Sequence, residues 1–175
     1  MGAGLALHTP RLVLRPARAE DLPAIHAIMR QRKAMAYWST PPHDTLEQTR
    51  EWLSGMIAIP AGMGEDFVIE KDGDVIGKAG FYRFPEIGYM LDPAQWGQGL
   101  AREAVSAVIG RGFEVHRLEC IRADVDPRNG ASLRLLAGLG FTETGRAERT
   151  WLIGEMWCDS VYLELTPRAW SSRTA

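Results

Sequence analysis

The sequence predicts a mixed α/β (α+β) fold, with an antiparallel sheet first and one β-α-β crossover after it. Two observations carry this prediction. Residues 66–91 contain β-rich runs separated by turn residues, which is typical of a meander. From residue 99 onward, stretches with helical periodicity alternate with short β-type runs, which indicates strands joined by helices. With 175 residues, the chain is long enough for one substantial core and too short for two, so we expect a single domain over 1–175.

The N-terminal third is expected to hold one strand and two helices. Residues 11–17 alternate leucines with arginines, which is the period-two pattern of a strand with one buried face. Asp21 and Pro23 then open a stretch in which apolar residues recur every three positions, as in a helix. Thr45 and Gln48 resemble a capping box, in which each side chain bonds the backbone N–H of the other residue. A second helix is therefore predicted to begin there.

The central meander depends on one turn. Asp72 and Gly73 join two of the β-rich runs, and this dipeptide supplies the positive φ angles that a tight hairpin turn requires. Residues 66–82 are therefore predicted to form a hairpin. A third run, 86–91, follows Pro85 and completes the antiparallel meander.

The C-terminal half is predicted to contain two helices and three strands. In the first helix Leu100, Ala104 and Val108 fall on one side, as expected of a helix that covers a sheet. The second helix ends at Gly140, the residue type preferred just after a helix C-terminus. In chain order, the predicted elements are a helix over 99–115, a strand over 118–125, a helix over 129–139, and strands over 141–149 and 156–165.

Composition and charge argue against several classes of partner. The 20 basic and 22 acidic side chains give a net charge of -2, which offers no field that would steer the chain onto nucleic acid. No apolar run approaches the ~18 residues of a membrane span, and the N-terminus lacks the basic region of a signal peptide. We therefore expect a cytoplasmic protein with no membrane partner. Cys120 and Cys158 fall in β-type stretches without the histidine pair of a zinc site, which predicts packing roles and no metal.

Two glycines stand where the helix over 99–115 has to begin. A helix N-terminus exposes unpaired N–H groups and a partial positive charge, and a chain without bulky side chains lets an anion approach them. Gly97 and Gly99 therefore predict a phosphate or pyrophosphate site, although a tight loop with left-handed angles explains the same residues. The sequence contains no P-loop string, and Arg102 stands where a Rossmann fingerprint needs glycine or alanine. Both nucleotide interpretations are weakened accordingly.

The stretch YMLDPAQWGQGLAREA resembles motif A of the GNAT acetyltransferase superfamily, in which a strand, a Gln/Arg-x-x-Gly-x-Gly/Ala loop and a helix bind the pyrophosphate of acetyl-CoA. Trp96 takes the Gln/Arg position, as in the branch of ribosomal-protein N-terminal acetyltransferase-like enzymes. The blocks TPRLVLRPARAEDL, EIGYML, NGASLRLLAGLGF and WCDSVYLEL also resemble that branch, so the resemblance covers a core of residues 9–165. It implies the GNAT fold, with a mixed, mostly antiparallel sheet of about seven strands in which strands 86–91 and 118–125 splay apart.

The resemblance also implies which residues hold acetyl-CoA, the expected cosubstrate. A bulge in strand 86–91 would leave main-chain groups free for the pantetheine and the thioester carbonyl. The loop and the helix start would take the pyrophosphate, and Asn129 would bond the pantetheine while capping its own helix. The implied cofactor-binding residues are Tyr89, Met90, Leu91, Trp96, Gly97, Gln98, Gly99, Leu100, Ala101, Arg102, Asn129, Ser132 and Arg134.

Acyl transfer to an amine needs a neutral nucleophile, stabilisation of the oxyanion and a proton for the leaving thiolate. Asp124 and Glu86 are the candidate bases, and either would act through a water. Without a catalytic role, Asp124 is explained as a turn residue and Glu86 as a solvated charge at a strand end. Many superfamily members have a general-acid tyrosine where this chain has Leu136, so Ser132 is the candidate donor. A bond from Ser132 to the helix backbone or to the pantetheine is the alternative, since the thiolate of CoA is a tolerable leaving group without an acid. Trp38, in a Pro-rich loop, is expected to line the acceptor pocket together with Glu86.

We therefore expect an acetyl-CoA-dependent N-acetyltransferase in which a primary amine attacks the thioester directly in a ternary complex. The acceptor is a protein N-terminus, as the branch implies, or a small amine such as an aminoglycoside or a polyamine. A non-catalytic acyl-CoA-binding module is the rival interpretation, because the general-acid tyrosine is missing at Leu136. The branch contains monomers and dimers, so a monomer and a homodimer both stay open.

Overall fold

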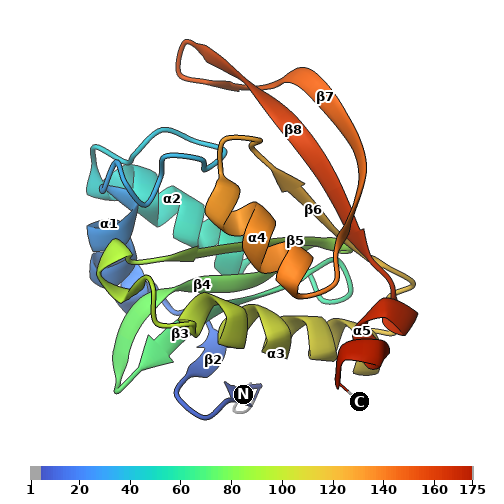
Figure 1. The fold of residues 1–175 in the computed structure, drawn as a ribbon. Helices are drawn as coiled ribbons and strands as arrows, with labels where there is room; N and C mark the ends of the chain where they lie inside the picture. The colour runs from blue at the N-terminus through green and yellow to red at the C-terminus, as the bar shows by residue number, and fades with distance from the viewer. Residues whose placement is uncertain (1–4, 175) are drawn as a thin grey trace.

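One sheet of eight strands runs through the chain, and residues 5–174 are described by the structure, which is a computed structural model (Figure 1). In chain order the strands are β1 (Leu7–His8), β2 (Val13–Pro16), β3 (Glu65–Lys71), β4 (Asp74–Arg83), β5 (Glu86–Leu91), β6 (Ile121–Val125), β7 (Thr142–Ile153) and β8 (Met156–Leu165). Their order across the sheet is β1-β2-β3-β4-β5-β6-β8-β7. The parallel pair β5–β6 lies between antiparallel neighbours on both sides, because a helical crossover joins those two strands.

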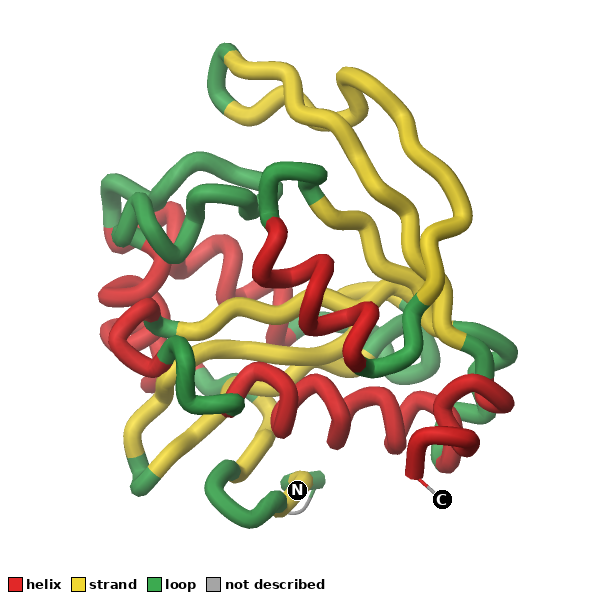
Figure 2. The backbone as a smooth tube through the Cα atoms, viewed as in Figure 1, coloured by secondary structure: helices red, strands yellow, loops and turns green. Residues whose placement is uncertain are grey.

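The helices lie on both faces of this sheet. Within residues 5–174 they are α1 (Leu22–Met29), α2 (Leu46–Ile57), α3 (Leu100–Glu114), α4 (Gly130–Gly138) and α5 (Pro167–Thr174), with short 3-10 turns η1 (Ala19–Asp21) and η2 (Pro93–Gln95). The tube view shows α3 and α4 on one side of the strands and α1 with α2 on the other (Figure 2). The result is three layers, with the sheet in the middle.

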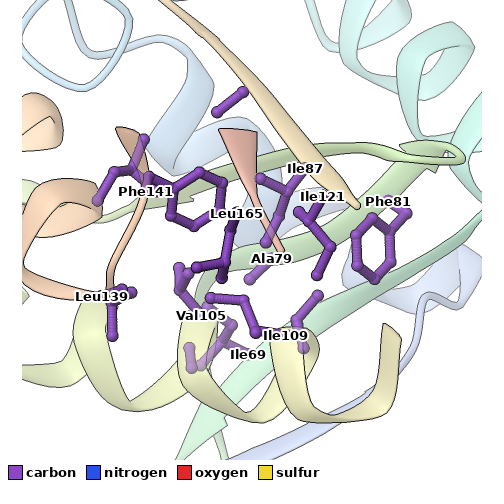
Figure 3. Packing of buried hydrophobic residues seen from close by; sticks show 14 of the residues in the cluster. Ile69, Ala79, Phe81, Ile87, Val105, Ile109, Ile121, Leu139, Phe141 and Leu165 are labelled. Atoms are coloured by element: carbon purple, nitrogen blue, oxygen red, sulfur yellow. The ribbon is translucent and has the colours of Figure 1, made fainter. Parts of the chain in front are cut away.

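Two apolar clusters hold these layers together. On the α3 side, Val105 and Ile109 belong to a buried cluster with Ile69, Ala79 and Ile87 of the central strands (Figure 3). On the α1–α2 side, a smaller cluster joins both helices to the sheet through residues that include Ile25, Met29, Leu53, Val68 and Met90. Since successive side chains of a strand point to opposite faces, β5 sends Met90 toward α1 and α2, and its neighbours toward α3 and α4.

Strands β5 and β6 part almost as soon as they meet. Their pairing consists of a single register position, Glu86 opposite Arg122, supported by a hydrogen bond from the Arg122 N–H to the Pro85 carbonyl at 3.0 Å. Beyond this point β6 turns away together with β8 and β7 (Figure 2). The splay expected of strands 86–91 and 118–125 is therefore confirmed. The edge of β5 that β6 leaves uncovered faces a cleft.

Local sequence signals identified several elements correctly. Asp72 and Gly73 have φ angles of 54° and 91° and close the β3–β4 hairpin. Thr45 and Gln48 form the predicted capping box of α2. Gly140, with φ 99°, follows the end of α4 and lets the Phe141 N–H bond the Leu136 carbonyl.

Other boundaries were wrong. The sheet has eight strands rather than about seven, because the two-residue β1 pairs with β2. The strand predicted over 118–125 begins only at Ile121, so Cys120 lies outside it and is half-buried, whereas Cys158 is buried in β8 as expected. Strand β7 continues to Ile153 instead of ending at 149, because long-range pairing with β8 overrides its irregular polar pattern. Helix α5 was not predicted.

The expected bulge lies in the neighbouring strand. The register between β4 and β5 is regular from Leu91 to Ile87, and it shifts between Phe81 and Arg83 of β4 rather than within β5. The uncovered edge of β5 therefore results from the divergence of β6, not from a register shift in β5. Among residues 5–174, no helix has both the length and the apolar character needed to cross a bilayer.

Candidate active site

A cleft of about 520 Å³ opens where β5 and β6 separate. Its lining comes from segments far apart in the sequence: the connection between α1 and α2, helix α2, strands β3 to β6, helix α4 and the β7–β8 hairpin. In Figure 1 this hairpin extends beyond the body of the molecule on the side where β6 turns away. Beyond the lining, β5 leads to the backbone-rich start of α3. The candidate site therefore has two ends with different chemistry, this corner outside the cleft and the aromatic and acidic side chains that line the cleft.

The corner between β5 and α3 presents bare backbone. Gly97 and Gly99 both have φ of 77°, a left-handed conformation that glycine adopts without the strain other residues incur. A Cβ on Gly97 would meet no heavy atom within 4 Å, so the space beside it is open. The N–H groups of residues 98–102 have no acceptor within residues 5–174, as expected at a helix start. This corner fits the diphosphate of a nucleotide-type cofactor.

Side chains from elsewhere hold that corner in place. The indole N–H of Trp96 donates to the Leu91 carbonyl at 3.0 Å, and the Lys33 ammonium lies 5.2 Å from the Trp96 ring centroid. Trp96 therefore closes the loop onto the end of β5, and its indole N–H bonds the protein itself. Arg102 donates to the Gly138 carbonyl at 3.1 Å and so joins α3 to the end of α4.

Arg11 is a residue of this corner that sequence reasoning missed. Its guanidinium donates to the Gln98 carbonyl at 2.8 Å and to the Glu103 carboxylate at 2.7 Å, and the Arg11 N–H adds a bond to the same carboxylate. Thr9 donates to Glu103 as well, at 2.6 Å. The N-terminal segment thus braces this corner across a separation of 87 residues, which no local pattern reveals.

Tyr89, Ser132 and Asn129 form the wall next to that corner. The Tyr89 phenol and the Ser132 hydroxyl are 2.5 Å apart, and the Asn129 side chain accepts from the Ser132 N–H at 3.2 Å. The predicted cap of α4 by Asn129 is therefore correct. Burial raises the pKa of Tyr89 to about 12. Leu136, fully buried, lines the cleft one helical turn further on.

The opposite wall carries carboxylates. Asp124 of β6 accepts a hydrogen bond from the Trp151 indole at 2.9 Å, and Asp159 of β8 accepts one from the Arg149 N–H at 2.9 Å. Glu51 of α2 adds a third exposed carboxylate to the lining. Within residues 5–174 none of these three has an ion-pair partner. Asp126 also lines the cleft, but Arg128 neutralises it.

Aromatic side chains line the same cleft as these carboxylates. The lining includes Tyr37 and Trp38 from the α1–α2 connection, Trp52 from α2, Tyr82 from β4 and Trp151 from β7. The indole nitrogen of Trp38 is buried and has no hydrogen-bond partner among the described residues. Rings combined with carboxylates suit a positively charged amine, because both attract a cation.

The one lysine of the lining is already paired with a carboxylate of the protein. Lys78 of β4 and Asp66 of β3 form an ion pair at 2.7 Å with side chains only 2% and 3% exposed. The ammonium also donates to the Gly88 carbonyl at 3.2 Å and lies 5.6 Å from the Trp38 ring centroid. Burial raises the pKa of Asp66, against the opposing effect of Lys78. Because Lys78 is neutralised within the protein, the acceptor wall keeps its negative charge.

The remaining candidates take other places. Glu86 lies at the junction of β5 and β6 and not on the lining of the cleft, although its charge adds to burial in raising the pKa of the nearby Tyr82. The side chains of Met90 and Leu91 are buried in the two apolar clusters. Arg134 is exposed on α4, next to Gly130. No group of three potential metal ligands occurs among residues 5–174.

Comparison with known proteins agrees with this geometry. The family model of the acetyltransferase (GNAT) domain matches residues 11–142. The chain belongs to this acetyltransferase family. It is thus an acyltransferase, and acetyl-CoA is its acyl donor. It is 31% identical over 148 residues to the uncharacterized N-acetyltransferase p20 of Bacillus licheniformis, a match that covers 79% of this chain and 83% of that protein.

Two further relatives differ in their named acceptors. The chain is 25% identical to the spermidine N(1)-acetyltransferase of Vibrio cholerae, over 85% of this chain and 89% of that protein. The structure of a ribosomal-protein-S5-alanine acetyltransferase from Vibrio fischeri superposes with a TM-score of 0.80 at 26% identity, covering 95% of this chain and 99% of the other. The proteins similar to this chain therefore include one enzyme named for a polyamine acceptor and one named for a ribosomal-protein acceptor.

Proposed function

We propose that this acetyltransferase binds acetyl-CoA and a cationic primary amine together in the cleft, and that the amine attacks the thioester directly. The observation that supports this most is the course of β5: its residues 87–89 line a cleft that carries unpaired carboxylates, and the strand then leads to a corner of bare backbone at the start of α3. The corner suits the anionic cosubstrate, and the carboxylates suit the cationic one. Separate places for the two charges favour simultaneous binding of both.

The cosubstrate is held mainly by backbone. The diphosphate would accept from the free N–H groups of residues 98–102, and the helix N-terminus favours its negative charge. Gly97 and Gly99 let it approach, and Arg11 keeps the loop in position. The pantetheine would run along the edge of β5 that β6 leaves uncovered, beside Asn129. Main-chain N–H groups on this edge are the candidates to polarise the thioester carbonyl.

The acceptor amine would enter from the side of α1 and α2. Its ammonium form is attracted by Glu51, Asp124 and Asp159, and it has to lose a proton before it attacks. Asp124 is the preferred base, because its carboxylate lies on the lining and is oriented by the Trp151 indole. Glu86 lies off the lining and is the weaker candidate.

A protein N-terminus next to basic residues and a polyamine are both cationic primary amines, so both fit the cleft. The test has to distinguish between them. The enzyme is incubated with acetyl-CoA and one acceptor at a time, and the release of free thiol is followed. The panel holds a peptide with a basic N-terminal region, the same peptide with neutral residues, a linear polyamine and a neutral monoamine. Turnover of at least one cationic acceptor, well above its neutral counterpart, is expected. Binding of coenzyme A without turnover of any amine would instead support a non-catalytic module.

A further inference from the structure

One pair in the cleft has no role in the scheme above, although it lies beside the path proposed for the pantetheine. Tyr89 of β5 and Ser132 of α4 both line the cleft, with their oxygens 2.5 Å apart. Alternation along β5 directs Tyr89 toward α4. Next to Ser132 on this wall, Leu136 is apolar, so it offers no polar atom to a leaving group. Departure of a thiolate is favoured by a hydrogen-bond donor at the sulfur.

The direction of the Tyr89–Ser132 hydrogen bond decides what the serine can do. A serine hydroxyl has one proton, and its oxygen accepts through two lone pairs. If Ser132 donated to the phenol, its only proton would point at Tyr89 and not at a ligand. If the phenol donates to Ser132, the serine proton is free to point at a ligand. The Asn129 cap fixes the Ser132 backbone. The direction of the serine proton is then set by rotation of the hydroxyl group.

We propose that Tyr89 is a positioning residue that donates its hydrogen bond to Ser132 and so commits the Ser132 proton to the sulfur of the departing thiol. The inference rests on the proposed function. As the amine nitrogen bonds to the acetyl carbon and the carbon–sulfur bond breaks, the electron pair goes to sulfur, which the Ser132 hydroxyl stabilises as a thiolate. No O–H bond of the pair breaks. The proton that the amine loses goes to the base, and the thiolate is protonated from water after release.

The buried state of Tyr89 supports this assignment. Burial raises the pKa of the phenol to about 12, so at neutral pH it has a proton to donate to the Ser132 oxygen. The raised pKa also makes Tyr89 a poorer proton donor to a thiolate than an ordinary tyrosine. Burial therefore favours orientation of Ser132 over proton transfer from Tyr89.

The test removes one oxygen from each partner. Tyr89→Phe keeps the ring and its packing, and Ser132→Ala keeps the helix position. We expect each variant to lower kcat by roughly tenfold to a hundredfold, the range for loss of one donor at a developing charge, with both KM values within about twofold. The double variant should be no slower than the slower single variant, because both remove the same hydrogen bond to sulfur. Tyr162→Phe, on the exposed face of β8, is the matched control and should match wild type.

Three outcomes would overturn the inference. One is a Tyr89→Phe enzyme with kcat within twofold of wild type. Another is a double variant whose loss is the product of the two single losses, which indicates independent roles. The third is a parallel rise in KM for acetyl-CoA with kcat unchanged, which indicates that Tyr89 only shapes the binding site. Wild-type turnover is measured alongside. Its absence with every amine would remove the proposed function itself, and the inference with it.

Discussion

The two ends of the candidate site are built by different means. The corner at α3 presents backbone N–H groups and left-handed glycines from one continuous stretch of chain, which Arg11 braces from outside that stretch. The wall beneath the β7–β8 hairpin uses side chains from at least five separate elements. A backbone site is fixed by local conformation, so it tolerates change in most side chains. A wall assembled from distant side chains changes its specificity with single substitutions. Relatives that share a cosubstrate while differing in acceptor fit this contrast.

The largest effect is expected beneath the acceptor wall, where Lys78 and Asp66 are buried together. Lys78→Met leaves the Asp66 carboxylate buried without a countercharge, so we expect the free energy of unfolding to fall by about 3–5 kcal/mol in urea denaturation. Adding Asp66→Asn removes the stranded charge and should recover most of the loss. Lys71→Met, which breaks an exposed pair with Asp72, is the control and should cost less than about 1 kcal/mol. Equal losses for the two lysines would show that the buried pair has no special role.

At the other end, Gly99→Ala should impair cosubstrate binding alone. A Cβ at this φ of 77° costs roughly 1–2 kcal/mol of strain and would lie 3.6 Å from the Arg11 guanidinium, which braces the loop proposed to hold the diphosphate. We predict a rise of about tenfold or more in KM for acetyl-CoA, with the acceptor KM unchanged. Gly110→Ala on α3, where a Cβ meets no atom within 4 Å, is the matched control and should stabilise the helix slightly. A variant that binds coenzyme A as tightly as wild type would place the diphosphate elsewhere.

Replacing a single carboxylate of the acceptor wall should have a smaller effect, and it should change the KM for the acceptor rather than the KM for acetyl-CoA. Asp159→Asn removes one unpaired charge without changing the shape of the wall, so we expect KM for a cationic acceptor to rise about three- to tenfold. The KM for acetyl-CoA should stay the same, and the effect should shrink at high salt. Glu119→Gln, an exposed change outside the cleft, serves as control. An unchanged acceptor KM at low salt would mean that the amine does not meet this wall.

This contrast also explains how much the sequence predicted. The α3 corner was predictable because Gly97 and Gly99 carry their structural requirement in their own backbone angles. Trp38 was singled out by another local feature, because it is an aromatic residue in a Pro-rich loop. Asp159 and the pairing of Lys78 with Asp66 depend on strand register and on contacts between distant segments. No periodicity or local motif encodes those contacts.

Two expectations depended on contacts that the sequence does not encode. Glu86 was expected at the acceptor because it opens the strand of the motif. In the fold it lies at the junction of β5 and β6, off the lining of the cleft. Tyr89 was expected to act through its main chain only, and its phenol meets Ser132 because α4 crosses β5 at that level. In both cases the position along a strand was predicted correctly, and the partner across the fold was not.

The smallest effect is expected from acidification, which should loosen the acceptor side first. His43 and His26 both place Nδ1 against the Thr49 hydroxyl, at 2.9 and 2.7 Å, and so anchor the connection that carries Trp38. Burial, and then the charge of His26, lower the pKa of His43. The unfolded chain thus binds a proton more readily, and the stability that the neutral ring contributes is present above about pH 6.5 and lost as the pH falls below it.

We predict a fall in Tm of roughly 2–4 °C, on the order of 1 kcal/mol, between pH 7 and pH 5, measured by circular dichroism. His43→Asn keeps an amide near the position of Nδ1 and should flatten this dependence. His8→Asn, on the exposed strand β1, should leave it unchanged. A pH profile that His43→Asn does not alter would assign the acid sensitivity to other groups.

A crystal structure with coenzyme A bound is the most direct measurement of the division between the two ends. Electron density should place the diphosphate on the N–H groups of residues 98–102 and the sulfur next to the Ser132 hydroxyl, with the carboxylates of Asp124 and Asp159 free to meet an amine. Density that places the diphosphate among the aromatic side chains beneath the hairpin, or that leaves the α3 corner without a ligand, would contradict the account.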